Sequence, residues 1–271
     1  MSIHLSVVMP VNNERYLVAE SVRRVLAVRD DTISHLDLVI VDDGSTDGTR
    51  DILRRLAKEH ADRITLIELP RNAGKGAAVA AGVARATGAV TVIQDADLEY
   101  NPADLPRLLV PFIREGADAV FGSRFLAADY RRVLYFRHSL GNRLLTFLSN
   151  VVTDVNLTDV ETCYKAVRTE LLQSIPLRSR DFRIEVELTI KLAKRGARLF
   201  EVPISYAGRT YREGKKIGWR DGLKALGAMA HWWLVDDLYR PDAYGSNILV
   251  SMSEVPRFNR WMSDVVRPFV G

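Results

Sequence analysis

The chain has 271 residues, of which 47% are hydrophobic and 27% are charged. This length and composition are those of a globular protein with a sizeable core, and they exclude an intrinsically disordered chain. The formal net charge of +4 is too small an excess to indicate a nucleic-acid-binding protein, so we expect no nucleic-acid partner.

Strand and helix patterns alternate through the first half of the chain. Five apolar runs predict strands at Leu5–Pro10, Leu38–Val41, Ile64–Leu69, Ala89–Gln94 and Ala117–Gly122. Helical patterns lie between them at Tyr16–Val28, Gly48–His60, Gly76–Ala86 and Pro102–Glu115. This alternation predicts a Rossmann-like, mostly parallel sheet flanked by helices, in which ligands bind beyond the carboxyl ends of the strands.

The second half of the chain is less regular. We expect helices at Leu134–Val152, Glu185–Arg195 and Trp219–Tyr239, and strands at Thr162–Val167 and Leu199–Val202. The pattern predicts a first domain over residues 1–218, followed by a C-terminal amphipathic helix and tail over residues 219–271.

The sharpest motif is Asp95-Ala96-Asp97, which directly follows a predicted strand. Two carboxylates separated by one small residue can share a hard cation such as Mg²⁺ or Mn²⁺, and Glu99 could add a third oxygen ligand. The alternative is a solvated acidic turn, but the position at the end of a buried strand favours a metal site.

Two further loops carry polar groups at strand ends. Asp42, two residues after Ile40, can accept hydrogen bonds from a base or ribose, although a simple strand-turn-helix junction explains it equally well. Gly74 and Lys75 open a helix and could receive a phosphate or a nucleotide edge. The chain lacks both the Walker spacing and the G-x-G-x-x-G fingerprint, which counts against a dinucleotide oxidoreductase.

In order and spacing, a set of motifs resembles the nucleotide-sugar-binding half of family 2 glycosyltransferases, at Pro10–Glu14, Val41–Thr49, Asn72–Gly76, Asp95–Glu99 and Gly122–Arg124. Asp159–Lys165 and Pro203–Lys216 resemble the bacterial relatives of dolichol-phosphate mannose synthase. The resemblance covers Ser6 to Trp219 and implies a GT-A fold with a C-terminal helical extension. It also implies inverting transfer of a hexose from GDP-mannose or UDP-glucose to a polyprenyl phosphate.

The resemblance implies roles for individual residues, numbered as in this chain. Those expected at the nucleotide sugar are Pro10, Asn12, Glu14, Ile40, Asp42, Gly74, Lys75, Asp95, Ala96, Arg124, Arg209 and Lys215. Asn12 stands where these enzymes often have Tyr, and Glu99 stands where Gln is usual. The expected metal ligands are Asp95, Asp97 and Glu99, and the expected catalytic residues are Asp97, Arg124, Asp159 and Glu161.

The acceptor decides whether a base is needed. A lipid phosphate is already ionised near neutral pH, whereas a hydroxyl acceptor requires a base, for which Asp159 and Glu161 are the candidates. The equal alternative is that these two carboxylates pair with a nearby Arg or Lys. A transferase for a soluble hydroxyl acceptor and a non-catalytic nucleotide-sugar-binding protein therefore stay open as alternatives.

Apolar side chains at helical spacing suggest how a lipid acceptor is approached. They are Tyr135, Phe136, Leu140, Leu144 and Phe147, flanked by arginines, and Trp219, Leu223, Leu226, Ala230 and Trp233 in the last helix. Core packing or a homodimer contact is the alternative. The single cysteine, Cys163, fits a reducing compartment, and neither a signal-peptide pattern nor an apolar run of about 18 residues is found. We expect a cytoplasmic protein that docks peripherally on the inner face of the membrane or on a membrane partner protein.

Overall fold

The computed structural model describes residues 2–126, 133, 135–208, 219–238 and 261. The chain divides into two compact units, Met1–Asp236 and Asp237–Gly271, and every helix and strand named below belongs to the first. The predicted domain end at residue 218 falls within 209–218, outside the described residues.

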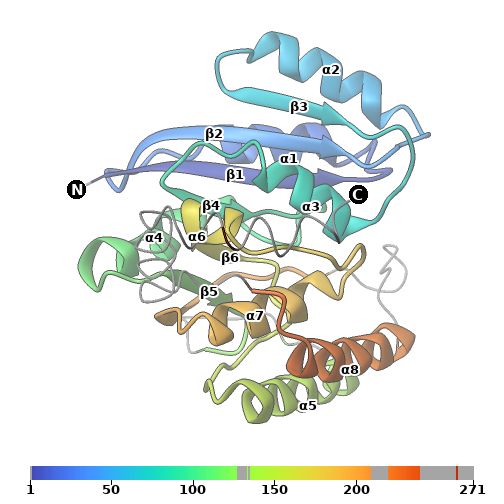
Figure 1. The fold of residues 1–271 in the computed structure, drawn as a ribbon. Coiled ribbons are helices and arrows are strands. Elements are labelled where there is room, and N and C mark those ends of the chain that lie inside the picture. Colours follow the sequence, from blue (N-terminus) through green and yellow to red (C-terminus); the bar gives the residue numbers. More distant parts are fainter. Residues whose placement is uncertain (1, 127–132, 134, 209–218, 239–260, 262–271) are drawn as a thin grey trace. The chain divides into compact units, whose positions relative to one another are not determined.

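The described residues form a sheet of seven strands in the order β3-β2-β1-β4-β6-β5-β7 (Figure 1). The strands are β1 (Ile3–Val11), β2 (Ile33–Asp42), β3 (Ile64–Glu68), β4 (Val90–Ile93), β5 (Ala119–Ser123), β6 (Lys165–Arg168) and β7 (Leu199–Pro203). β6 runs antiparallel to β4 and β5, and the other pairs are parallel. The predicted mostly parallel sheet is confirmed.

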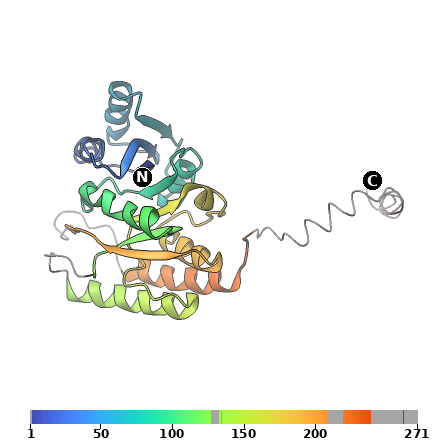
Figure 2. The ribbon, with the colours of Figure 1, turned by 90° about the vertical axis from the view of Figure 1, so that its left-hand side faces the viewer.

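Helices lie on both faces of this sheet (Figures 1 and 2). They are α1 (Val18–Leu26), α2 (Thr49–Glu59), α3 (Lys75–Val83), α4 (Leu105–Arg114), α5 (Phe136–Thr153), α6 (Thr169–Gln173), α7 (Ile184–Lys194) and α8 (Trp219–Leu234), with a short 3₁₀ turn, η1 (Pro102–Asp104), before α4. The short helix α6 was not predicted, because five residues are too few to show a helical period. The last helix ends at Leu234 rather than at the predicted Tyr239, which lies outside the described residues.

The central strands are buried on both faces because helices cover both. In β1 the side chains from Leu5 to Met9 are all buried, and β4 is buried along its whole length. Such strands show continuous rather than alternating hydrophobicity, which is typical of parallel sheets. The polar loops that follow β1, β2 and β4 therefore emerge together at one edge of the sheet.

Helices α5, α7 and α8 pack together beside the sheet (Figure 1). Val186 and Ile190 of α7 meet Met229 and Trp232 of α8 in one buried cluster. On α8, Leu226 packs against this cluster, whereas Ala230 and Trp233 are exposed and the side chains of Trp219 and Leu223 are outside the described set. Much of the apolar surface of α8 is therefore buried in the core.

Helix α5 keeps an apolar stripe exposed. Its members recur every three or four residues, and each is at least half exposed: Phe136, Leu140, Leu144, Phe147 and Val151. Within the described ranges, no helix combines the length and apolar content that a membrane crossing requires.

Candidate active site

A cavity of about 330 Å³ opens where the loops after β1, β2, β4 and β5 meet. Many predicted site residues line it: Pro10, Asn12, Glu14, Gly74, Lys75, Asp95, Ala96, Asp97, Glu99, Arg124 and Glu161. The lining also holds residues to which the sequence analysis gave no role in the site, among them Asp43, Asn72, Cys163, Phe182, Glu185 and Tyr206. Arg209 and Lys215 lie in 209–218, outside the described residues.

Asp43 rather than Asp42 faces the cavity. Asp42 is fully buried, and its Oδ2 accepts a hydrogen bond of 2.6 Å from Nε of Arg50. Ile40 is likewise fully buried, so neither predicted base contact lines the cavity. Successive residues at a strand end point to opposite sides, and the sequence alone does not say which aspartate faces the ligand.

The start of α3 is already occupied by the protein's own acceptors. Asp43 accepts hydrogen bonds from the backbone N–H groups of Ala73 and Gly74, at 2.6 and 2.9 Å. The N–H of Gly76 donates to the carbonyl of Arg180 at 2.8 Å. These N–H groups therefore already have partners within the chain, and phosphate binding at this helix start stays a prediction.

Glycine is required at this helix start for packing. A Cβ at Gly76 would lie 1.9 Å from the carbonyl oxygen of Ser179, and one at Gly74 would lie 2.2 Å from that of Arg180. The two glycines let the segment around residues 179–181 approach the helix, which places Phe182 at the cavity.

Lys75 is the centre of a buried chain of charges. Its Nζ lies 2.9 Å from Oδ1 of Asp95 and 3.0 Å from Oε1 of Glu185, whose Oε2 lies 2.8 Å from Nζ of Lys165. Burial alone would lower the pKa of Lys75, but the two carboxylates outweigh it and hold the pKa well above its usual value. Lys75 thus stays protonated and holds the carboxylate of Asp95 in place.

The acidic loop after β4 is held in a constrained shape. Asp97 Oδ1 accepts a hydrogen bond of 3.1 Å from the backbone N–H of Glu99, across Leu98, whose φ is +63°. Glu99 Oε2 in turn accepts a hydrogen bond of 2.6 Å from the hydroxyl of Tyr206. A non-glycine residue at positive φ costs about 1–3 kcal/mol, so the surrounding contacts must enforce this turn.

The carboxylates that line the cavity are of the kind that holds a hard cation. Asp95 and Asp97 both line the cavity and offer oxygen ligands, and Mg²⁺ is commonly held by one or two carboxylates together with substrate phosphates. In the described part of the chain, Asp95, Asp97 and Glu99 do not converge to within ligand distance of one another. Oε2 of Glu99 accepts a hydrogen bond from Tyr206, and the role of Glu99 as a third ligand stays a prediction.

One group of possible metal ligands that the sequence spacing did not suggest lies outside the cavity. One ligand atom each of His4, His35 and Asp37 lies within 4.8 Å of the others, because β1 and β2 pair His4 with His35 there. The carboxylate of Asp37 already bonds His4 and the hydroxyl of Ser6, so the group acts as a hydrogen-bonded cluster near the start of the two strands.

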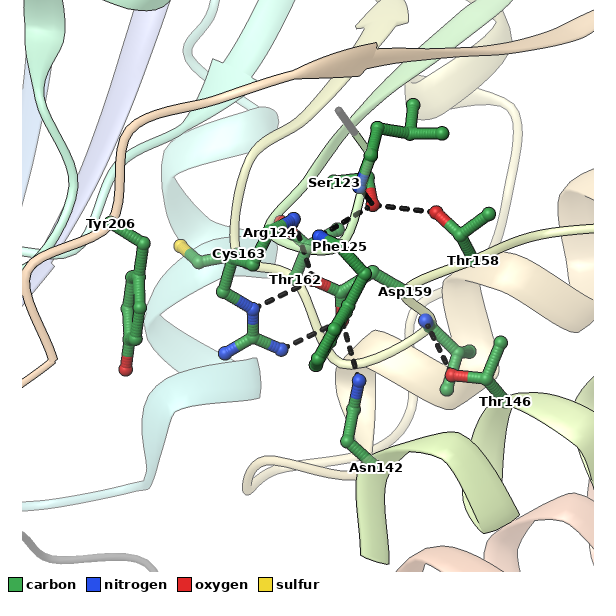
Figure 3. A network of polar contacts seen from close by, with 12 residues as sticks. Ser123, Arg124, Phe125, Asn142, Thr146, Thr158, Asp159, Thr162, Cys163 and Tyr206 are labelled. Atoms are coloured by element: carbon green, nitrogen blue, oxygen red, sulfur yellow. Dashed lines mark hydrogen bonds and ion pairs between the residues drawn. The ribbon is translucent and has the colours of Figure 1, made fainter. Parts of the chain in front are cut away.

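Arg124 is clamped by Asp159 (Figure 3). The carboxylate of Asp159 accepts bonds of 2.7 Å from both Nε and Nη2 of Arg124, and 3.1 Å from its backbone N–H. Although burial alone would lower the pKa of Arg124, the charge of Asp159 raises it well above its usual value. Arg124 lines the cavity, whereas Asp159 is fully buried behind it.

This pairing matches the alternative reading of Asp159, a carboxylate paired with a nearby arginine, and it holds Arg124 in place. A catalytic role for Asp159 stays a prediction. The bidentate geometry is the arrangement in which a guanidinium is most firmly oriented.

Glu161 also lines the cavity, and no salt bridge to it is found among the described residues. Its Oε1 is buried and has no hydrogen-bond partner in that part of the chain. Burial raises the pKa of Glu161 to about 7, with the nearby Lys165 opposing and Glu185 reinforcing the change. A carboxyl group with this pKa is half protonated near neutral pH.

The fold is that of solved glycosyltransferase structures. Glucosyl-3-phosphoglycerate synthase from Mycobacterium tuberculosis, solved with Mn²⁺, UDP and glucosyl-3-phosphoglycerate, superposes with a TM-score of 0.64 at 21% identity. The match covers 87% of this chain and 81% of that one. A structure of the same enzyme with Mg²⁺ and UDP gives a TM-score of 0.61 at 22% identity. The predicted GT-A fold is confirmed.

Sequence comparison then gives the family. The profile described as Glycosyl transferase family 2 matches residues 6–175, and the chain belongs to this family. Polyprenol monophosphomannose synthase of Mycolicibacterium smegmatis is 30% identical over 232 residues, 83% of this chain and 85% of that protein. Undecaprenyl-phosphate 4-deoxy-4-formamido-L-arabinose transferase of Edwardsiella ictaluri is 30% identical over 212 residues, 78% of this chain and 62% of that protein. The chain thus spans less than two thirds of the length of the second relative.

Proposed function

We propose that this protein transfers a hexose from a nucleotide sugar, GDP-mannose or UDP-glucose, to a polyprenyl phosphate with inversion at the anomeric carbon. The observation that carries the proposal is the pairing of two features in one cavity: the carboxylates of Asp95 and Asp97, and the clamped guanidinium of Arg124. The first suits a cation-bound diphosphate and the second suits a phosphate. Relatives named for polyprenol or undecaprenyl phosphate support this acceptor class.

Mg²⁺ or Mn²⁺ is the proposed cofactor, held by Asp95 and Asp97 together with the donor diphosphate. The bound cation would neutralise the charge that develops on the leaving nucleoside diphosphate. Lys75 holds Asp95 in place, and the loop turn at Leu98 presents Asp97. Pro10, Asn12 and Glu14 line the same cavity and are the proposed contacts of the nucleotide.

The acceptor chemistry follows from the clamp on Arg124. One oxygen of the lipid phosphate forms the new bond to the anomeric carbon, and the bond from that carbon to the diphosphate breaks. The attacking oxygen is already ionised, so the protein orients the two phosphates and screens their repulsion. Asp159, with its oxygens committed to Arg124, is not needed as a base.

A hydroxyl acceptor is the second candidate, and Glu161 favours it. A buried carboxyl with a pKa of about 7 is suited to accept a proton near neutral pH. Nucleotide-sugar binding without transfer is the remaining alternative.

The proposed route to a lipid acceptor is docking on the cytoplasmic face of the membrane through the exposed stripe of α5. Phe136, Leu140 and Phe147 are 78%, 57% and 61% exposed, and Arg143 on the same helix is exposed. An apolar stripe next to basic residues is typical of helices that lie in the lipid interface. Contact with a membrane partner protein or a second copy of the chain is the competing use of this stripe.

The proposed function is tested with purified protein, Mn²⁺ and each nucleotide sugar, with and without a short polyprenyl phosphate. A glycosylated lipid phosphate, identified by mass spectrometry and absent with Asp97→Ala, is the expected product. Nucleoside diphosphate release with a soluble hydroxyl acceptor, and none with the lipid phosphate, would instead support the second candidate. Metal-dependent nucleotide binding without turnover would support a non-catalytic protein.

A further inference from the structure

The two sides of helix α5 make different contacts. Its exposed side carries the apolar stripe, and its inner side reaches the carboxylate that holds Arg124 (Figure 3). Asn142 lies on α5 and donates a hydrogen bond of 3.0 Å from Nδ2 to Oδ1 of Asp159. One turn further on, Thr146 accepts a hydrogen bond from the backbone N–H of Val160 at 3.2 Å. The helix therefore contacts the 159–160 loop at two points.

Each oxygen of the Asp159 carboxylate accepts two hydrogen bonds. Oδ1 accepts from Nη2 of Arg124 and from Asn142, and Oδ2 accepts from Nε and the backbone N–H of Arg124. The backbone of this loop is fixed from the other side by Glu201, whose Oε1 accepts from the N–H of Asp159 at 3.3 Å. Among these contacts, the hydrogen bond of Asn142 is the one by which α5 reaches the carboxylate of Asp159.

Arg124 is in turn connected to the acidic loop through Tyr206. Its guanidinium carbon lies 5.0 Å from the ring centroid of Tyr206, and the hydroxyl of Tyr206 donates to Glu99. A guanidinium held along one edge by a carboxylate and against a ring has little freedom to rotate. The cavity is thus joined to α5 by the continuous series Asn142, Asp159, Arg124, Tyr206 and Glu99.

We infer that Asn142 is a positioning residue, which fixes the guanidinium of Arg124 for a phosphate group and joins this placement to helix α5. This deepens the proposed function and rests on it for the identity of the phosphate. Removing the amide leaves Asp159 with one buried acceptor position unsatisfied and lets the carboxylate and its arginine shift together. A small displacement of an orienting group is enough to reduce the rate strongly.

Asn150 provides a matched control on the same helix. Its amide bonds Leu157 twice, donating to the carbonyl at 2.8 Å and accepting from the N–H at 3.1 Å, and none of its hydrogen bonds involves Asp159. Asn150→Ala therefore removes more backbone hydrogen bonds than Asn142→Ala while leaving the clamp intact. If α5 acted only through its stability, Asn150→Ala would be the more damaging change.

The test measures kcat/KM for a short polyprenyl phosphate and the KM for the nucleotide sugar in both variants and in Asn142→Asp. Asn142→Ala should lower kcat/KM for the acceptor about tenfold, the value of one hydrogen bond to a charged group, with an unchanged donor KM. Asn142→Asp should lower it further, because its added carboxylate repels Asp159. Equal losses in Asn142→Ala and Asn150→Ala would overturn the inference while leaving the proposed function in place.

A second measurement does not depend on any substrate. The Nε–H of Arg124 is buried against Asp159, so its solvent exchange, followed by NMR and assigned with Arg124→Lys, should be slow. Asn142→Ala should accelerate this exchange at least severalfold more than Asn150→Ala. Identical exchange in the two variants would overturn the inference even if the wild-type protein transferred no sugar to a lipid phosphate.

Discussion

The buried carboxyl of Glu161 makes the stability of this protein depend on pH. Its pKa is about 7 in the folded chain, against an ordinary value of 4.5. Below pH 4.5 the group is protonated in both states and contributes nothing. As the pH rises through 4.5 to 7, the unfolded chain loses the proton first, so the folded state loses stability. At about 1.4 kcal/mol for each pH unit, the full penalty above pH 7 is about 3 kcal/mol.

Glu161→Gln removes the ionisable group and keeps the shape. The variant should match the wild type at pH 4.5, apart from any pH-independent cost of the amide. It should gain on the wild type as the pH rises, by up to about 3 kcal/mol at pH 8. Urea unfolding at several pH values measures this difference, and Glu170→Gln on the surface is the control. A difference between Glu161→Gln and wild type that stays constant from pH 4.5 to pH 8 would refute the reasoning.

Three further predictions concern packing, charge and docking. Gly76→Ala should destabilise the protein by about 1–3 kcal/mol because its Cβ meets a carbonyl, whereas Gly227→Ala in α8, which meets nothing, should be neutral or stabilising by thermal unfolding. Lys75→Met leaves two largely buried carboxylates without their shared cation, so the free energy of unfolding in urea at pH 8 should fall by about 3 kcal/mol; no change would contradict the charge chain. Phe147→Ser should weaken co-sedimentation with anionic vesicles, while Tyr16→Ser, at a more exposed aromatic side chain outside α5, should not; equal binding by both would argue against docking through α5.

The parallel half of the fold was predictable because its strands are short, apolar and separated by helical patterns. Their order was not, since β6 inserts antiparallel between β4 and β5 and nothing in residues 165–168 specifies its neighbours. Pairing between distant segments depends on tertiary packing rather than on local propensity.

In the candidate site, too, some residues could be predicted from the sequence and others could not. Asp95 and Asp97 were identifiable because they end a buried strand, but the pairing of Asp95 with Lys75 depends on how α3 packs. Asp43 was missed beside Asp42 because only the register of β2 decides which of them faces the cavity. Phe182 comes from a later segment with no motif to mark it, and Tyr206 lies in a motif, Pro203–Lys216, that did not by itself place its side chain at the cavity.

The central claim is that the acceptor nucleophile is a phosphate oxygen placed by Arg124. Two acceptors of identical chain length, a polyprenyl phosphate and the corresponding polyprenol, separate this claim from every hydroxyl mechanism. With purified protein, Mn²⁺ and the active nucleotide sugar, the account predicts a glycosylated product from the phosphate alone, reduced strongly in Arg124→Lys. Glycosylation of the polyprenol at a comparable rate, dependent on Glu161, would contradict it.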